Sequence, residues 1–149
     1  MRPPRDSDYL FTLLALFAGT ACGLSEPLPP AISVSMTISR TSLRMSDTIT
    51  VDLVGTNITA ETIRIPNSAC LVNLDARNEQ DQSVGFGDPL VCDAIYLSPR
   101  VLAPGESWRQ AVLVVHPPAG QFRVCGGLPA ALGVDGYVYS GFTAVTVRP

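Results

Sequence analysis

The side chains that could perform chemistry are one histidine, four cysteines and thirteen acidic residues. A serine hydrolase of the common α/β type places its nucleophile on a sharp turn with the pattern G-x-S-x-G. That pattern does not occur in the sequence, and His116 precedes Pro117-Pro118 in a predicted turn. A single histidine in a turn is typical of solvated surface. We therefore predict no catalytic residues and a protein that is not an enzyme.

Asp88 and Asp93, which flank Cys92, are the acidic residues closest to a cation-binding pattern. They lack the alternating acidic spacing with glycine that calcium loops use. The sequence has no C-x-x-C motif and only one histidine, which argues against zinc. We expect no metal and no cofactor. Asn57-Ile58-Thr59 matches a glycosylation signal, but we interpret the match as chance and expect Asn57 to end a strand.

The N-terminus has the three-part layout of an export signal. Arg2 and Arg5 open it, an apolar run from Tyr9 to Ala18 follows, and small residues at 19–21 precede Cys22. The run is shorter than the ~20 residues that a spanning helix needs. We predict that residues 1–21 are a cleaved signal peptide and that Cys22 carries lipid, as in bacterial lipoproteins. The alternative is ordinary secretion with an unmodified Cys22.

Residues 22–31 are predicted to form a Pro-rich tether between the lipid and a folded domain. Three prolines fall between Gly23 and Ala31, and proline is excluded from helix interiors and central strands. Such a segment prefers an extended form of about 3 Å per residue, which gives a reach of roughly 25 Å. A leader without a mechanical role is the alternative.

The remaining cysteines are Cys70, Cys92 and Cys125, an odd number once Cys22 is lipidated. Three pairings are open. We favour a Cys70–Cys92 disulfide, because both residues flank a polar stretch that resembles a hairpin. Closing that loop would stabilise the fold by about 3 kcal/mol in the chain-entropy model. Cys125 is then a thiol, and strand alternation places it on the outer face; three reduced thiols in the core are the alternative.

Residues 32–149 have the size of one domain. The net charge is −3, and the ten basic residues are all arginines that occur singly along the chain. Aromatic residues are few, and no stacking surface is evident. Without a basic patch to hold phosphates, we expect no nucleic-acid partner.

Polar and apolar residues alternate along most of this domain, as they do in strands with one buried face. The first example is residues 32–39, and a short strand at 62–65 is predicted to end at Pro66. Turn signals recur about every 10 residues, which predicts seven to eight strands in an all-β, antiparallel Ig-like β-sandwich. The predicted core includes one side of two consecutive strands: Trp108, Val112, Val114, Phe122 and Val124.

Three segments resemble a known family. They are Val51–Asn57, the block L-A-P-G-E-S-W at Leu102–Trp108 and the block G-Q-F-R-V at Gly120–Val124. Over about residues 32–128 they resemble the Ig-like sandwich of the BsuPI-type intracellular proteinase inhibitors. The resemblance implies the fold. The export signal and the cysteines depart from that family, so it does not by itself imply inhibitor activity.

Two functions follow from these observations. The first is a non-enzymatic lipoprotein of the bacterial cell envelope, anchored in the membrane, whose domain is a structural module or binds a protein or glycan partner. The second is a proteinase inhibitor, secreted or in the envelope, in which Asn78–Pro89 enters a protease cleft. A loop held by a disulfide would suit an inhibitor because it loses less entropy on binding, and it would equally suit a structural hairpin.

Overall fold

The computed structural model describes residues 30–68, 71–89 and 97–149. The predicted signal peptide (1–21) and nearly all of the predicted tether lie outside the described residues.

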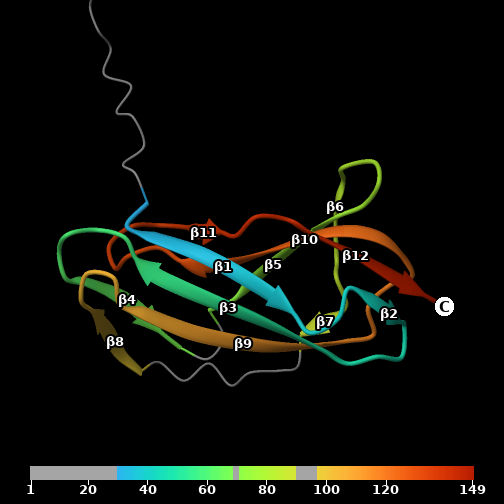
Figure 1. Ribbon diagram of the computed structural model, residues 1–149, viewed down its shortest axis with the longest axis horizontal. Coiled ribbons are helices and arrows are strands. Elements are labelled where there is room, and N and C mark those ends of the chain that lie inside the picture. Colours follow the sequence, from blue (N-terminus) through green and yellow to red (C-terminus); the bar gives the residue numbers. More distant parts are fainter. Residues whose placement is uncertain (1–29, 69–70, 90–96) are drawn as a thin grey trace, which may run out of the picture.

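All of the regular structure in the described residues is β-strand, and no helix capable of crossing a membrane is found there. Figure 1 shows the strands arranged in two layers. Their bounds are β1 Ile32–Ile38, β2 Ser42–Arg44, β3 Ile49–Asn57, β4 Ile63–Asn67, β5 Asn73–Arg77, β6 Ser83–Val84, β7 Asp88–Pro89, β8 Leu97–Leu102, β9 Ser107–Val115, β10 Gly120–Pro129, β11 Tyr137–Tyr139 and β12 Thr143–Arg148.

The strand order is that of an Ig-like domain. The first sheet has the order β1-β3-β9-β7, which corresponds to strands A-B-E-D. The second sheet has the order β2-β12-β10-β5-β6, in which β12-β10-β5-β6 corresponds to G-F-C-C′, and β11 also pairs with β10. Neighbours are antiparallel except β2, which runs parallel to β12. The predicted antiparallel Ig-like sandwich is confirmed, with additional short strands.

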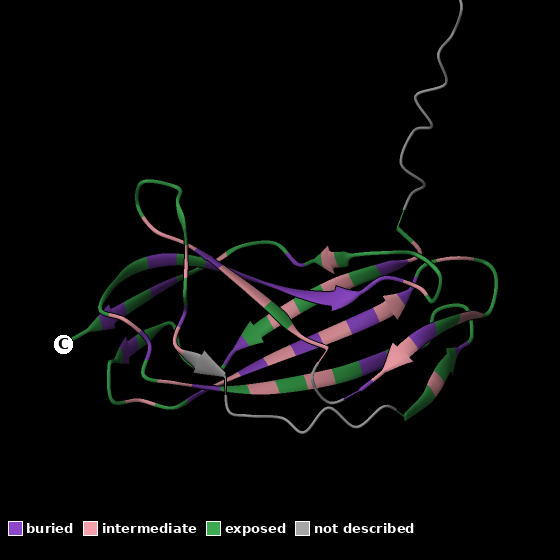
Figure 2. Cartoon of the chain, turned by 180° about the vertical axis from the view of Figure 1, so that it is seen from behind, coloured by how far each residue is buried: buried purple, intermediate pink, exposed green. Residues whose placement is uncertain are grey.

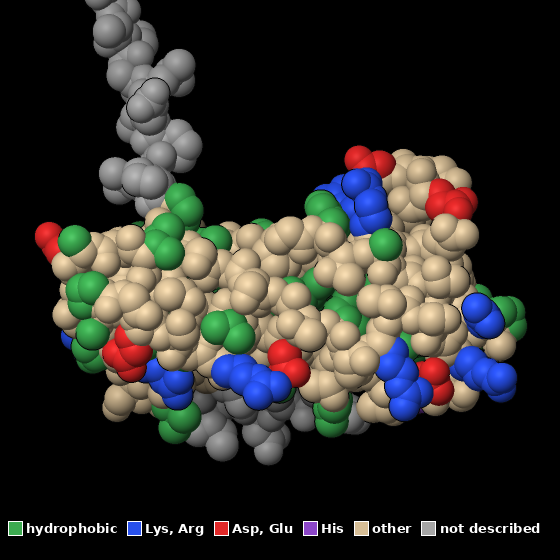
Figure 3. All heavy atoms as spheres, in the orientation of Figure 1, with side chains coloured by type: hydrophobic (Ala, Val, Ile, Leu, Met, Phe, Trp, Pro, Cys, Tyr) green, Lys and Arg blue, Asp and Glu red, His purple; other side chains and the backbone are tan. Residues whose placement is uncertain are grey.

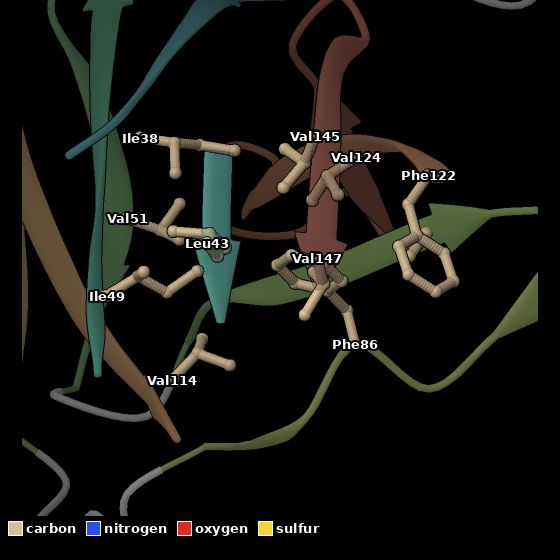
Figure 4. Packing of buried hydrophobic residues seen from close by; sticks show 11 residues of the cluster. Ile38, Leu43, Ile49, Val51, Phe86, Val114, Phe122, Val124, Val145 and Val147 are labelled. Atoms are coloured by element: carbon tan, nitrogen blue, oxygen red, sulfur yellow. The ribbon is translucent and has the colours of Figure 1, made fainter. Parts of the chain in front are cut away.

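Alternation along the strands creates the core between the sheets. In β1 the buried or half-buried side chains are Ile32, Val34, Met36 and Ile38, while the residues between them are exposed. Figure 2 shows the same alternating bands along the longer strands. Figure 4 shows side chains of both sheets meeting in one of two apolar clusters. That cluster comprises Ile38, Leu43, Ile49, Val51, Ala76, Phe86, Val114, Phe122, Val124, Val145 and Val147.

The second cluster is built around Trp108, with Ile32, Leu53, Ile65, Leu102 and Leu128. Trp108 on β9 lies opposite Gly55 on β3. A Cβ atom at Gly55 would lie 2.2 Å from the indole ring, so the missing side chain makes room for the ring. Of the predicted core residues, all are buried except Val112, which is half-buried against the first cluster.

One predicted strand end is wrong. Pro66 does not terminate the strand that begins near residue 62, since β4 continues to Asn67. The pairing of β4 with β8 is irregular between Ile65 and Asn67. This irregularity accommodates a residue without an N–H donor.

Candidate functional site

The predicted cysteine sites, Cys22, Cys70 and Cys92, lie outside the described residues, as does Asp93. Asp88 forms part of the short strand β7. Among the described residues, no three histidine, cysteine or acidic side chains gather as a metal site would require. His116 follows β9, is exposed and has a left-handed backbone conformation with φ of 51°, which is consistent with the predicted turn.

Asn57 ends β3, as predicted, and its side chain serves the fold. The residue is 1% exposed. Its Nδ2 donates to the carbonyls of Glu61 at 2.8 Å and Leu102 at 3.1 Å. Its Oδ1 accepts from the backbone N–H of Thr59 at 2.9 Å and from the Thr59 hydroxyl at 2.8 Å. The glycosylation-like motif is therefore an internal hydrogen-bond network that closes the β3–β4 loop.

A hairpin at residues 77–84, formed by the end of β5, its turn and β6, projects from the sandwich, and we call it the projecting hairpin (Figure 1). The Asn78 carboxamide organises its turn. Oδ1 accepts from the N–H groups of Gln80 at 3.0 Å and Gln82 at 2.9 Å, while Nδ2 donates to Gln82 Oε1 at 3.0 Å. Asp81 takes the left-handed conformation that the tight turn requires, with φ of 60°. The turn is thus ordered by its own side chains.

Polar contacts hold the base of the projecting hairpin to the sheet. Asp75 on β5 accepts hydrogen bonds from the Ser83 hydroxyl at 2.6 Å and from Arg77 Nε at 2.8 Å. Together these contacts lower the pKa of the Asp75 carboxyl, the Ser83 hydrogen bond having the larger effect. Arg123 on β10 makes a further ion pair with Asp81 in the turn. Figure 3 shows arginine and acidic side chains gathered on this projection.

Three exposed aromatic rings lie on β11 and in the segment that follows it. Tyr137, Tyr139 and Phe142 are 40%, 44% and 50% exposed. The other aromatic residues that the structure describes, Phe86, Trp108 and Phe122, are in the core. We call the three exposed rings the aromatic platform. This surface differs from the expectation that no stacking surface exists, and Tyr-x-Tyr spacing followed by Phe142 is the signal that could have indicated it.

The Tyr139 side chain crosses the second sheet over Gly127. A Cβ atom at Gly127 on β10 would lie 2.8 Å from Tyr139 Cε1. Gly127 pairs with Tyr139 on one side and with Asn73 on the other. The Tyr139 side chain reaches across β10 to β5, because its hydroxyl accepts a hydrogen bond from Asn73 Nδ2 at 2.7 Å. The ring therefore lies over Gly127, and Tyr139 remains 44% exposed.

Phe142 is held in place by Arg123, whose guanidinium carbon lies 5.2 Å from the ring centroid. At this distance the cation is attracted by the face of the ring. Since Arg123 also pairs with Asp81 in the projecting hairpin, this one side chain links the hairpin to the aromatic platform.

A hollow of about 570 Å³ lies between the aromatic platform and β5 and β6. Its lining includes Asn73, Asp75, Ser83, Tyr139 and Phe142, together with Cys125. Two further hollows flank the projecting hairpin, of about 620 Å³ and 350 Å³. We call this surface, on the side of the second sheet away from the core, the outer face. It combines apolar rings with fixed hydrogen-bonding groups, which is the composition of a binding surface.

Cys125 borders this hollow, on the predicted side of its strand, yet it is buried rather than exposed, with 4% of its surface accessible. Among the described residues it is a free cysteine. Burial raises the pKa of its thiol, and the nearby Asp75 carboxylate adds to that rise. The neutral form is unreactive, since the thiolate is the nucleophile.

We predict that the native protein holds one slowly reacting thiol, Cys125, and a Cys70–Cys92 disulfide. Titration with a thiol reagent at pH 8 should be slow for the native chain and complete within minutes in denaturant. Cys125→Ala should abolish the signal, which controls for the assignment. Non-reducing peptide mapping identifies the pairing. A disulfide that contains Cys125 would contradict the prediction.

No family model matches the sequence, and no curated protein matches it. Among solved structures, the chain is similar to the sporulation control protein Spo0M of Bacillus subtilis, with 14% identity and a TM-score of 0.49; the match covers 81% of this chain and 51% of that chain. The putative ApaA protein of Bordetella pertussis has 15% identity and a TM-score of 0.47, with 80% of this chain and 96% of that chain covered.

A β-glucosidase of Erythrobacter marinus, EmGH1, is similar over 80% of this chain and 16% of that chain, with 12% identity and a TM-score of 0.48. The chain therefore spans about half the length of Spo0M and a small part of the glucosidase. These likenesses place the chain in no family.

Proposed function

We propose that this chain is a non-enzymatic lipoprotein of the bacterial cell envelope whose Ig-like domain binds a protein or glycan partner through its outer face. The observation that carries the proposal is the position of the aromatic residues. Two exposed rings, Tyr139 and Phe142, line a hollow and Tyr137 lies next to Tyr139, while the other described aromatic residues are in the core. Exposed rings that the core does not need are typical of binding surfaces.

The position of the N-terminus supports a membrane anchor. The carbonyl of Ala31 accepts a hydrogen bond from the Ile58 N–H at 3.1 Å, so the described chain starts beside the β3–β4 loop. Figure 1 shows this start at one end of the sandwich and the projecting hairpin toward the other. A lipid at Cys22, joined by the Pro-rich tether, would attach at the end of the sandwich away from the projecting hairpin. Without lipid at Cys22, the protein would be secreted.

We predict that Cys22→Ser releases the protein from the membrane. In a bacterial host that expresses the full chain, the natural protein should partition into the detergent phase, and the variant should move to the aqueous or secreted fraction. Ser25→Ala, three residues further along the predicted tether, is the matched control and should leave partitioning unchanged. Unchanged membrane association of Cys22→Ser would refute the anchor and leave the binding surface to be judged separately.

The projecting hairpin favours a second candidate, a proteinase inhibitor of the envelope. Its turn is ordered by Asn78 and by the contact between Arg123 and Asp81, so little entropy would be lost when it enters a protease cleft. Glu79 and Gln80 are exposed at its tip, next to the exposed Asp81 and Gln82. Inhibition of an envelope protease that is lost on replacing both Glu79 and Gln80 would favour this function over the first.

A further inference from the structure

We propose that the ligand of the outer face is an uncharged saccharide, which stacks on Tyr139 and reaches into the adjoining hollow. This inference deepens the proposed function and rests on it. A pyranose ring has one face rich in C–H groups and a rim of hydroxyls. It therefore requires an aromatic ring with one open face, beside a row of fixed hydrogen-bonding groups. The outer face provides both.

The exposed ring is that of Tyr139, which is 44% exposed. Its side chain crosses Gly127, and its hydroxyl accepts a hydrogen bond from Asn73 at 2.7 Å beyond it. The hydrogen bond fixes the position of the hydroxyl end of the side chain on the sheet. Tyr137 lies next to it, with ring centroids 6.3 Å apart and planes tilted by 44°. The two neighbouring rings extend the apolar surface beyond one ring, which suits a sugar chain better than a single flat base.

The hydrogen-bonding groups lie on β5 and β6, at the wall of the hollow. Asn73 provides a carboxamide and Asp75 a carboxylate, both in the lining. The contacts from Ser83 and Arg77 orient the Asp75 carboxylate and keep it ionised. Charged acceptors of this kind bind hydroxyl groups strongly. These groups would contact the hydroxyl rim of a ring stacked on Tyr139.

Charge excludes the other ligands that stack on aromatic rings. Sites for single-stranded nucleic acids combine stacking with a basic groove. Here Asp75 and Arg77 both line the hollow, Glu79 and Asp81 lie on the projecting hairpin, and the net charge is −3. Arg77 and Arg123 are already engaged by these carboxylates. A phosphate or an anionic sugar would have to displace a carboxylate from one of these two arginines, which favours an uncharged saccharide.

The test is calorimetric titration of the full chain, solubilised in detergent, with cellohexaose and with N-acetylchitohexaose. We expect at least one hexaose to bind. Tyr139→Ala should weaken binding by about tenfold or more, since the stacking surface is lost. Tyr139→Phe keeps the ring and should change affinity by less than about threefold. Leu113→Ala on β9, an equally exposed apolar residue of the other sheet, should have no effect.

Phe142→Ala provides a second variant should Tyr139→Ala fail to fold, and it should also weaken binding. Absence of binding by both hexaoses would overturn the saccharide proposal. The same conclusion would follow if the folded Tyr139→Ala and Phe142→Ala variants bound the hexaoses with the affinity of the natural chain. Capture from an envelope extract of a ligand that depends on Tyr139 but is destroyed by protease would identify a protein partner. That result would refute the saccharide and leave the proposed function standing.

Discussion

Val124→Asp should prevent the domain from folding. Val124 is fully buried in β10 between Ala76 and Thr143 of the neighbouring strands. A carboxylate there would have no partner in an apolar cluster, and even a protonated carboxyl would cost several kcal/mol. Such a penalty consumes most of the stability of a domain of this size, which is about 5–15 kcal/mol. Far-UV circular dichroism with a thermal scan measures the loss.

Ala144→Asp is the matched control for this experiment. Ala144 is exposed on β12 and pairs with Arg123 across the strands. An aspartate there is solvated and faces an arginine, so the thermal midpoint should move by only a few degrees. A cooperative transition of Val124→Asp at the midpoint of the natural chain would show that β10 does not face the core.

Asn57→Ala should destabilise the domain by about 3 kcal/mol. The substitution removes four side-chain hydrogen bonds and takes the Asn57 partner from the Leu102 carbonyl and the Thr59 N–H, while the Glu61 carbonyl keeps its hydrogen bond from the Thr59 hydroxyl. Unsatisfied buried groups cost about 1–3 kcal/mol each. Thr59 and Glu61 are less buried, so water can partly replace the lost hydrogen bonds there. The summed loss of stability therefore stays near the lower end of the range that these costs give. Urea denaturation measures the change in free energy of unfolding.

Asn67→Ala is the control of the same residue type in a neighbouring strand. The Asn67 side chain donates one exposed hydrogen bond, to the carbonyl of Ser98 at 3.2 Å. Its loss should cost about 1 kcal/mol or less. Equal effects at Asn57 and Asn67 would mean that the Asn57 network contributes little beyond a surface contact.

Local patterns were sufficient to predict the sandwich and most of its core. Alternation identified the buried side of β1, and it placed Trp108 and Val124 in the core. In a strand with one solvent-exposed face, the alternation of polar and apolar residues shows which side chains face the core. Short strands such as β2 were not predictable in this way. Ser42–Arg44 has only one buried residue, Leu43, and its assignment depends on parallel pairing with β12, a distant segment.

The outer face was harder to predict because tertiary pairing creates it. Tyr139 meets Asn73 across Gly127 only when β11, β10 and β5 lie side by side. The linear sequence shows two tyrosines near a loop and an asparagine more than sixty residues away. The burial of Cys125 has the same origin. Alternation predicted the side of the strand on which Cys125 lies, but not its burial, which depends on neighbours such as β5 that are distant in the sequence.

Photo-crosslinking in living cells tests the central claim, that the outer face is the binding surface of an envelope protein. A photoreactive amino acid is placed at Tyr139 in one variant and at Leu113, on the opposite sheet, in another. We predict that light produces adducts in the envelope fraction from position 139 and few from position 113. Adducts of equal yield at both positions, or adducts at 113 alone, would contradict the account.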